Sequence, residues 1–167
     1  MDDATLLEGL LNQAQQQWDI PPDSLLEYMD MIAFHESKND PTAIQQSDIT
    51  ESGIGPGRGL YQYEVGKGQG AHTAINRLMR LTKNNIPDWA KELKNQNYDV
   101  SNLTPEQQKI LFIADKLKDE TASFKDVDTL KELAQFWADE HWAGEEALKE
   151  SKMETFLGDM NIYNRGQ

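Results

Sequence analysis

Residues 25–37 read LLEYMDMIAFHES, and apolar side chains recur in this run at the spacing of an α-helix. Five of them follow the i, i+3, i+4, i+7 pattern that gives a helix one apolar face: Leu25, Leu26, Met29, Ile32 and Ala33. The next position on that face is Glu36. The stretch therefore predicts an amphipathic helix with a carboxylate where the pattern calls for an apolar side chain.

Glu36 has two interpretations at this point. Burial of a charge is costly, so a carboxyl in this position is paired with a cation, hydrated in a cleft, or held protonated by apolar neighbours. The last environment makes a glutamic acid a general acid near neutral pH. Alternatively, the helix frays at Ser37 and Glu36 is an ordinary surface residue. The helix alone does not decide between the two.

The overall charge is strongly acidic, with 16 Lys and Arg against 29 Asp and Glu and a net charge of −13. Such a chain lacks the basic surplus needed to bind nucleic acid or to dock on an anionic membrane. It contains no cysteine, which excludes a disulfide framework and a thiolate metal site. Residues 1–30 show no signal-peptide pattern, and no apolar run reaches the ~18 residues of a membrane span. We therefore expect neither nucleic acid nor membrane as a partner.

Helical periodicity recurs along most of the chain. It predicts helices over residues 3–17, 22–37, 69–83, 87–94, 105–120, 128–143 and 145–157. Residues 38–68 are predicted to be a glycine-rich loop with a short extended piece at 60–65. Residues 95–102 are predicted to be a polar linker, and residues 158–167 an irregular tail. The fold class is therefore all-α, or mainly α with a minimal β element, in a single domain over residues 1–167.

Capping residues and composition refine two of these helices. Asp3 is predicted to cap the first one. Thr104, Pro105 and Gln107 provide the cap, the first-position proline and the capping-box residue for the helix at 105–120. That helix is apolar nearly all round, which predicts a buried helix in the middle of the domain.

Two familiar motifs fail on their spacing. The glycines at 55–59 and 66–70 lack the preceding apolar strand and the Gly-Lys-Ser/Thr of a phosphate loop. His35 and Glu36 begin like a zinc-protease helix, but the second histidine would have to stand at position 39, which is Asn39. Lone histidines such as His72 and His141 are usually packing or surface residues. We predict neither a metal site nor a cofactor.

The spacing from Glu36 to a later turn resembles a known family. Glu36-Ser37, then Pro41-x-Ala43, then residues 59–62 (Gly-Leu-Tyr-Gln) are similar to the pattern of the lysozyme-like domain of soluble lytic transglycosylases and goose-type lysozymes. That pattern is a catalytic Glu followed by Ser, a Pro-x-Ala step and a Gly-Leu-Met-Gln turn. The resemblance covers residues 25–80 well and continues more loosely through 105–120 and 136–144. It departs at position 61, where the family has Met, and at 142–144, where the family has a Tyr-Asn-x-Gly pattern.

The resemblance implies a lysozyme-like domain that cleaves the β-1,4 bond between MurNAc and GlcNAc in peptidoglycan. Glu36 would be the general acid that protonates the leaving oxygen. In a transglycosylase it would then act as base, while the muramyl 6-hydroxyl attacks internally to give an anhydro sugar. Ser37 would support Glu36 or touch substrate. Five residues would line the groove, with Gln62 as a polar substrate contact: Gly59, Leu60, Tyr61, Gln62 and Tyr63.

Other residues are predicted near the groove, with a second interpretation open for each. Glu64 stands where goose-type lysozymes place an acidic residue, so it either positions a water for hydrolysis or is a solvated loop charge. Arg58 either meets carboxylates of the substrate or pairs with a neighbouring Asp or Glu. His141 and Trp142 stand near the family's cleft-bordering segment; His141 lines the groove or packs in the core. Trp137 is expected to be core.

The leading hypothesis is a peptidoglycan-cleaving muramidase of the lytic-transglycosylase type. It is similar to the compact lytic domains that bacteriophages carry in the virion or release from the host cytoplasm at lysis; an exported bacterial effector fits equally well. The functional alternatives are a hydrolytic lysozyme that uses Glu64, and a non-catalytic module for sugar binding or virion assembly.

The expected partners are peptidoglycan glycan strands and virion or secretion-assembly proteins, and the isolated domain is expected to be a monomer. Because an acidic protein approaches an anionic wall poorly, delivery by other machinery to the periplasm or cell wall suits it.

Overall fold

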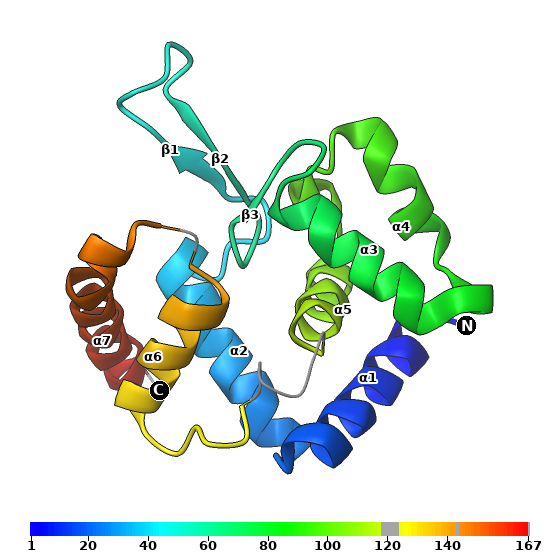
Figure 1. The fold of residues 1–167 in the computed structure, drawn as a ribbon, viewed down its shortest axis with the longest axis horizontal. Coiled ribbons are helices and arrows are strands. Elements are labelled where there is room, and N and C mark those ends of the chain that lie inside the picture. The colour runs from blue at the N-terminus through cyan, green and yellow to red at the C-terminus, as the bar shows by residue number, and fades with distance from the viewer. Residues whose placement is uncertain (118–123, 143, 167) are drawn as a thin grey trace.

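Helices form most of the protein, as the computed structural model shows for residues 1–117, 124–142 and 144–166 (Figure 1). The α-helices are α1 (Asp3–Trp18), α2 (Pro22–Ser37), α3 (Gly70–Thr82), α4 (Asp88–Glu92), α5 (Pro105–Lys116), α6 (Leu130–Glu140) and α7 (Lys149–Arg165). Short 3-10 turns lie at Lys83–Asn85, Leu93–Gln96, Val100–Asn102 and Glu146–Leu148. With one small sheet beside these helices, the prediction of a mainly α fold with a minimal β element is confirmed.

Helix α5 is the central helix that its composition predicted. Thr104 and Gln107 close the predicted capping box, since Thr104 Oγ1 accepts the Gln107 N–H at 3.1 Å and Gln107 Oε1 accepts the Thr104 N–H at 3.0 Å. All side chains from Ile110 to Lys116 are buried, and α5 packs against both α1 and α3. The helix ends at Lys116, and positions 118–120 of the predicted helix lie outside the described residues.

Helix α2 has the predicted bounds and lies between two groups of helices (Figure 1). Four residues of its apolar stripe are fully buried: Leu25, Met29, Ile32 and Ala33. The helix ends when Lys38 adopts a left-handed conformation with φ 56°, and the Lys38 and Asn39 N–H groups then bond back to the carbonyls of Phe34 and Ala33. This ending places Glu36 in the last turn of α2.

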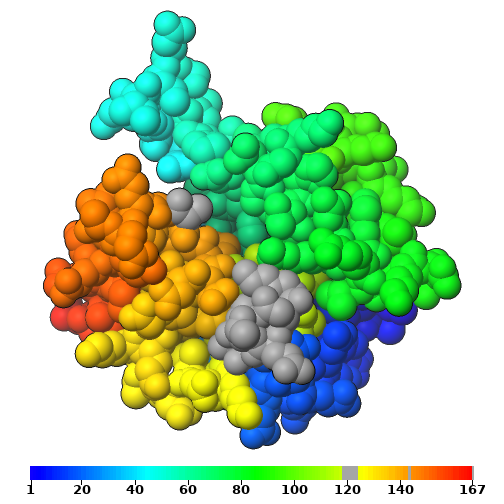
Figure 2. Space-filling model, in the orientation of Figure 1, coloured from blue at the N-terminus to red at the C-terminus, as the bar shows by residue number. Residues whose placement is uncertain are grey.

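Residues 38–68 form more than the predicted loop. They contain an antiparallel sheet of β1 (Ile44–Gln46), β2 (Ile54–Arg58) and β3 (Tyr63–Glu64) in the order β1-β2-β3. The β1–β2 hairpin projects from the body of the protein (Figures 1 and 2). The extended piece predicted at 60–65 is confined to Tyr63–Glu64. Strands β1 and β2 each hold one β-branched residue, Ile44 and Ile54, and are otherwise Gln, Gly, Pro and Arg, so local propensity gave only a weak signal for them.

Two further sequence predictions are wrong. Asp2, rather than Asp3, caps α1 by accepting the Thr5 N–H at 2.7 Å. The tail after residue 157 is helical, because α7 continues to Arg165. Its second half is stabilised by burial of Met160 and Tyr163. In the described residues, no helix is both long and apolar enough to cross a membrane.

Candidate active site

A cleft of about 710 Å³ is bounded by the last turn of α2, by α3, by the ends of α5 and α6, and by the sheet. Seven of the residues predicted to form the site line it: Glu36, Tyr61, Gln62, Tyr63, Glu64, His141 and Trp142. The sequence had placed these residues in three separate segments. The fold brings the three segments to one cleft, which is the main requirement of the predicted groove.

Glu36 contributes a carboxyl group that is partly exposed to this cleft. Trp137 of α6 donates its indole N–H to Glu36 Oε1 at 2.6 Å. Burial raises the pKa of the Glu36 carboxyl to about 7, against the Trp137 hydrogen bond and the Lys116 charge, which both favour the ionised form. A carboxyl with this pKa is protonated in a large fraction of molecules at neutral pH, as a general acid must be.

Trp137 is held in place by an aromatic cluster. Its ring meets the His35 ring edge-on, with centroids 4.6 Å apart, and stacks on Phe156 of α7 at 5.2 Å. His35 Nδ1 lies 2.7 Å from Asp159 Oδ2, also on α7. Trp137 is buried, as the sequence indicated, but its contact with Glu36 was not predicted. No local pattern in the sequence marks an indole that reaches a helix 101 positions away.

The turn at residues 59–62 is joined to α2 and α5 by two side chains. Ser37 Oγ lies 2.8 Å from the Leu60 carbonyl oxygen and 3.0 Å from the Ala33 carbonyl oxygen, so its proton can bond to either. Gln108 of α5 is buried, and its Oε1 accepts the Leu60 N–H at 2.8 Å. Gln108 Nε2 donates to the carbonyls of Pro41 at 2.9 Å and Leu103 at 3.0 Å. The turn is thereby fixed beside Glu36.

Gly59 is required by this arrangement. Its φ is +74°, in the left-handed region that favours glycine, and a Cβ there would overlap Gln108 Oε1. In the part of the chain that the structure describes, the cleft wall does not include Gly59, Leu60 or Ser37. These three predicted site residues lie behind the cleft and hold the turn.

The rest of the turn forms the cleft surface. Gln62 has φ 53°, and its Nε2 donates to the Gly59 carbonyl at 2.9 Å. Tyr61 and Tyr63 line the cleft with little exposure, 2% and 7%, because their rings pack into the core. Gln62 is partly exposed and contributes an amide side chain to the cleft wall.

Glu64 and Arg58 have different environments. Glu64 on β3 is partly exposed and lines the same cleft as Glu36. Arg58 lies outside the cleft wall, as far as the described residues show. Its Nη1 donates to the Gly55 and Gly57 carbonyls at 2.6 and 2.9 Å, and its Nε lies 3.6 Å from Asp99 Oδ2. The structure therefore places Arg58 within the sheet and against an acidic neighbour.

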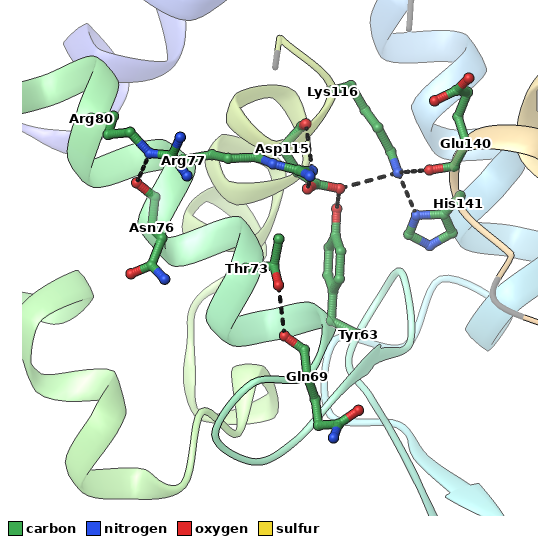
Figure 3. A network of polar contacts seen from close by, with 10 residues as sticks. All are labelled: Tyr63, Gln69, Thr73, Asn76, Arg77, Arg80, Asp115, Lys116, Glu140 and His141. Carbon is green, nitrogen blue, oxygen red and sulfur yellow. Dashed lines mark hydrogen bonds and ion pairs between the residues drawn. The ribbon is translucent and has the colours of Figure 1, made fainter. Parts of the chain in front are cut away.

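A buried polar cluster underlies the cleft on the side of α5 (Figure 3). Asp115 is ion-paired with Arg77 of α3, accepts the Tyr63 hydroxyl at 2.8 Å on Oδ2, and lies 3.1 Å from Lys116 Nζ. The Lys116 and Arg77 charges hold the pKa of the Asp115 carboxyl below its usual range, against the opposing effect of burial. All four residues line the cleft. Sequence reasoning missed Arg77, Asp115 and Lys116, although a charged pair inside the apolar run 110–117 was a visible signal.

His141 joins this cluster to the turn. Its Nδ1 lies 2.9 Å from Lys116 Nζ and its Nε2 2.6 Å from the Tyr61 carbonyl oxygen. Burial, reinforced by the Lys116 charge, lowers the pKa of His141 to about 3, so the ring is neutral. His141 thus lines the cleft and also connects α6 to the turn, which combines the two interpretations that its sequence left open.

Within the described ranges, no group of three or more His, Cys, Asp or Glu side chains could hold a metal ion. His35 contacts Asp159, His72 accepts the Gly68 N–H at 2.8 Å, and His141 contacts Lys116. A search of protein-family models, of curated proteins and of solved structures finds no match to this chain. Functional assignment therefore depends on the chemistry of the cleft and on the sequence resemblance.

Proposed function

We propose that this protein is a peptidoglycan-cleaving muramidase of the lytic-transglycosylase type, with Glu36 as its general acid and base. The observation that carries the proposal is a carboxyl group with a pKa of about 7 at the wall of a cleft of about 710 Å³. The likeness of residues 36–43 and 59–62 to the lysozyme-like family supplies the substrate class.

Proton transfer by Glu36 accounts for the reaction. Protonated Glu36 delivers its proton to the glycosidic oxygen between MurNAc and GlcNAc, and the bond from that oxygen to the muramyl C1 breaks. The resulting carboxylate then takes the proton of the muramyl C6 hydroxyl, whose oxygen forms a bond with C1. The products are a 1,6-anhydro-muramyl end and a new GlcNAc end, and Glu36 is again protonated. The first step requires protonated Glu36, so we expect activity to fall as pH rises through about 7.

The surroundings of Glu36 suit a glycan. Amide side chains from three different segments line the cleft, namely Gln45, Gln62 and Gln69. Amides both donate and accept hydrogen bonds, so they match the hydroxyl and acetamido groups of amino sugars. The Trp137 indole N–H, which can only donate, remains on Glu36 Oε1 and stabilises the carboxylate that forms when the proton leaves.

Hydrolysis is the second candidate, because Glu64 lines the same cleft as Glu36. If Glu64 positions a water on the opposite face of the sugar, water replaces the C6 hydroxyl as nucleophile, and the product has a reducing MurNAc end. Cell-wall penetration or host lysis by a bacteriophage is the biological setting that we propose. Virion or secretion-assembly proteins are the partners that this setting implies.

The end groups of the products distinguish these possibilities. Purified peptidoglycan is incubated with the wild type and with Glu64→Gln, and the released fragments are analysed by mass spectrometry. We expect anhydro-muramyl ends from both proteins. Reducing ends from the wild type that disappear in Glu64→Gln would replace the proposal with the hydrolytic one. Intact peptidoglycan after incubation with the folded wild type would refute both and would favour a non-catalytic sugar-binding or assembly module.

A further inference from the structure

Side chains from two other helices meet the C-terminal end of α6. Trp137 binds the Glu36 carboxyl from α2, while the Glu140 carbonyl and the His141 ring bind Lys116 from α5. Trp137 and Glu140 lie in the last turn of α6, and His141 is its C-cap, whose N–H donates to the Trp137 carbonyl at 3.0 Å. The Glu36 carboxyl and the Lys116 ammonium therefore reach the same turn of α6, and both line the cleft.

The Lys116 ammonium is held by three acceptors, which we call the Lys116 cradle. Its Nζ lies 2.8 Å from the Glu140 carbonyl oxygen, 2.9 Å from His141 Nδ1 and 3.1 Å from Asp115 Oδ2. The side chain is only 1% exposed. An ammonium has three N–H donors. The cradle thus replaces water around the ammonium and fixes its position.

The tautomer of His141 follows from its two contacts. The Tyr61 carbonyl, 2.6 Å from Nε2, can only accept a hydrogen bond, so Nε2 carries the proton. In a neutral ring, Nδ1 is then an acceptor, and it accepts from Lys116. A second proton on Nδ1 would face an ammonium at 2.9 Å. The cradle therefore requires a charged Lys116 beside a neutral His141.

Asp115, the anionic member of the cradle, is itself fixed from two other elements. It is ion-paired with Arg77 of α3 and accepts the Tyr63 hydroxyl of β3. These contacts stop the carboxylate from following Lys116 if the lysine moves. The ammonium is consequently a rigid charge within the cleft wall, built from α3, α5, α6 and the sheet (Figure 3).

We propose that Lys116 is a positioning residue that stabilises the ionised form of Glu36 after Glu36 has delivered its proton. The catalytic role of Lys116 rests on the proposed function. The effect of the Lys116 charge on the ionisation of Glu36 is independent of any substrate. A preorganised charge beside a developing carboxylate lowers the energy of the proton-transfer step without any reorganisation. The Lys116 charge is among the groups that act on the Glu36 carboxyl, in the direction of the ionised form.

Other charged and titratable groups near the Glu36 carboxyl must be considered in any titration. Seven of them line the cleft with Glu36: Glu64, Arg77, Asp115, Lys116, Asp139, Glu140 and His141. The other two are His35, which precedes Glu36 on α2, and its α7 partner Asp159. Asp139 has a cation of its own, since Lys149 Nζ lies 2.9 Å from its Oδ1. Of this set, Lys116 is the group that favours ionised Glu36, together with the Trp137 hydrogen bond.

The first test follows the ¹³C resonance of the Glu36 carboxyl by NMR between pH 4 and 10. In Lys116→Gln we expect the midpoint of the Glu36 titration to move to higher pH than in the wild type. Lys116→Arg keeps the charge and should return the midpoint toward the wild-type value. Lys109→Gln removes a charge from the same helix, two turns away and outside the cleft wall, and should leave the midpoint unchanged. Equal midpoints in the wild type and Lys116→Gln would overturn the proposal.

A second measurement covers the case in which Lys116→Gln does not fold. The ¹⁵Nζ resonance of Lys116 is followed over the same pH range in the wild type and in Glu36→Gln, which leaves the cradle intact. We expect an inflection at the Glu36 midpoint in the wild type and none in Glu36→Gln. A wild-type resonance without that inflection would overturn the inference. Peptidoglycan digestion has no part in either measurement, so failure of the inference is distinguishable from failure of the proposed function.

Discussion

Substitution of Glu36 by Gln should stabilise the folded protein at alkaline pH and change little at acidic pH. The pKa of Glu36 is about 7 in the folded protein and about 4.5 in the unfolded chain. Below about pH 4 the carboxyl is protonated in both states, so it has no effect on the free energy of unfolding. Between these two pKa values the unfolded chain loses its proton first. Folding stability therefore falls as pH rises and levels off above about pH 7.

The size of the effect follows from the same two values. A difference of about 2.5 in pKa corresponds to roughly 3 kcal/mol at 1.36 kcal/mol for each tenfold change in proton affinity. The Glu36 side chain is partly exposed to the cleft, so we expect about 2 kcal/mol. A glutamine avoids this cost because it does not ionise, and its side-chain oxygen can still accept the Trp137 N–H. In a domain of this size the gain amounts to a melting temperature higher by about 4–8 °C.

Urea unfolding at pH 4 and at pH 8 measures this gain. Glu27→Gln is the matched control, because Glu27 lies on α2 but is exposed. Glu36→Gln should unfold at a higher urea concentration than the wild type at pH 8 and at nearly the same concentration at pH 4. The control should follow the wild type at both. A Glu36→Gln protein that is no more stable than the wild type at pH 8 would refute the assignment of a Glu36 carboxyl whose pKa is raised in the folded protein.

Three further predictions concern the residues around Glu36. Trp137→Phe removes the donor to Glu36, so the carboxyl should titrate at higher pH and cleavage should slow by about tenfold or more, as measured by NMR titration and fragment release. Gln108→Leu leaves a buried N–H and two carbonyls without their partner, and urea unfolding should show a loss of about 2–4 kcal/mol. Gly59→Ala should cost more than Gly53→Ala by calorimetry, by about 1 kcal/mol or more, because both glycines have a positive φ but nothing lies near a Cβ at Gly53.

The helices were predictable where a side-chain pattern and a local end signal agree. The apolar stripe of α2 and the proline at its start give its bounds, and the capping box gives the start of α5. The tail was missed because Gly158 and a polar composition weaken the pattern of α7. Tertiary contacts override that weakness: the Tyr163 ring meets the Phe34 ring at 5.5 Å, and its hydroxyl donates to Asp30 at 3.1 Å.

The candidate site was predictable only in part, for a related reason. Glu36 breaks an apolar stripe, which marks it as a candidate, and its spacing to the turn at residues 59–62 favours a catalytic role over a surface one. The burial that raises its pKa, and the opposing effects of Trp137 and Lys116, are properties of the tertiary structure. Lys116 and Asp115 interrupt an apolar run much as Glu36 interrupts its own stripe. The partners of this charged pair, Arg77 and His141, lie in other segments, so their positions follow only from the tertiary structure.

The proposed role of Glu36 is to supply the proton that breaks the glycosidic bond. Its most direct test is the rate at which folded Glu36→Gln releases soluble fragments from purified peptidoglycan at pH 6, compared with the wild type and with Glu27→Gln. We predict that the wild type and Glu27→Gln release fragments at similar rates and that Glu36→Gln releases essentially none. Fragment release by Glu36→Gln at the wild-type rate would contradict this role.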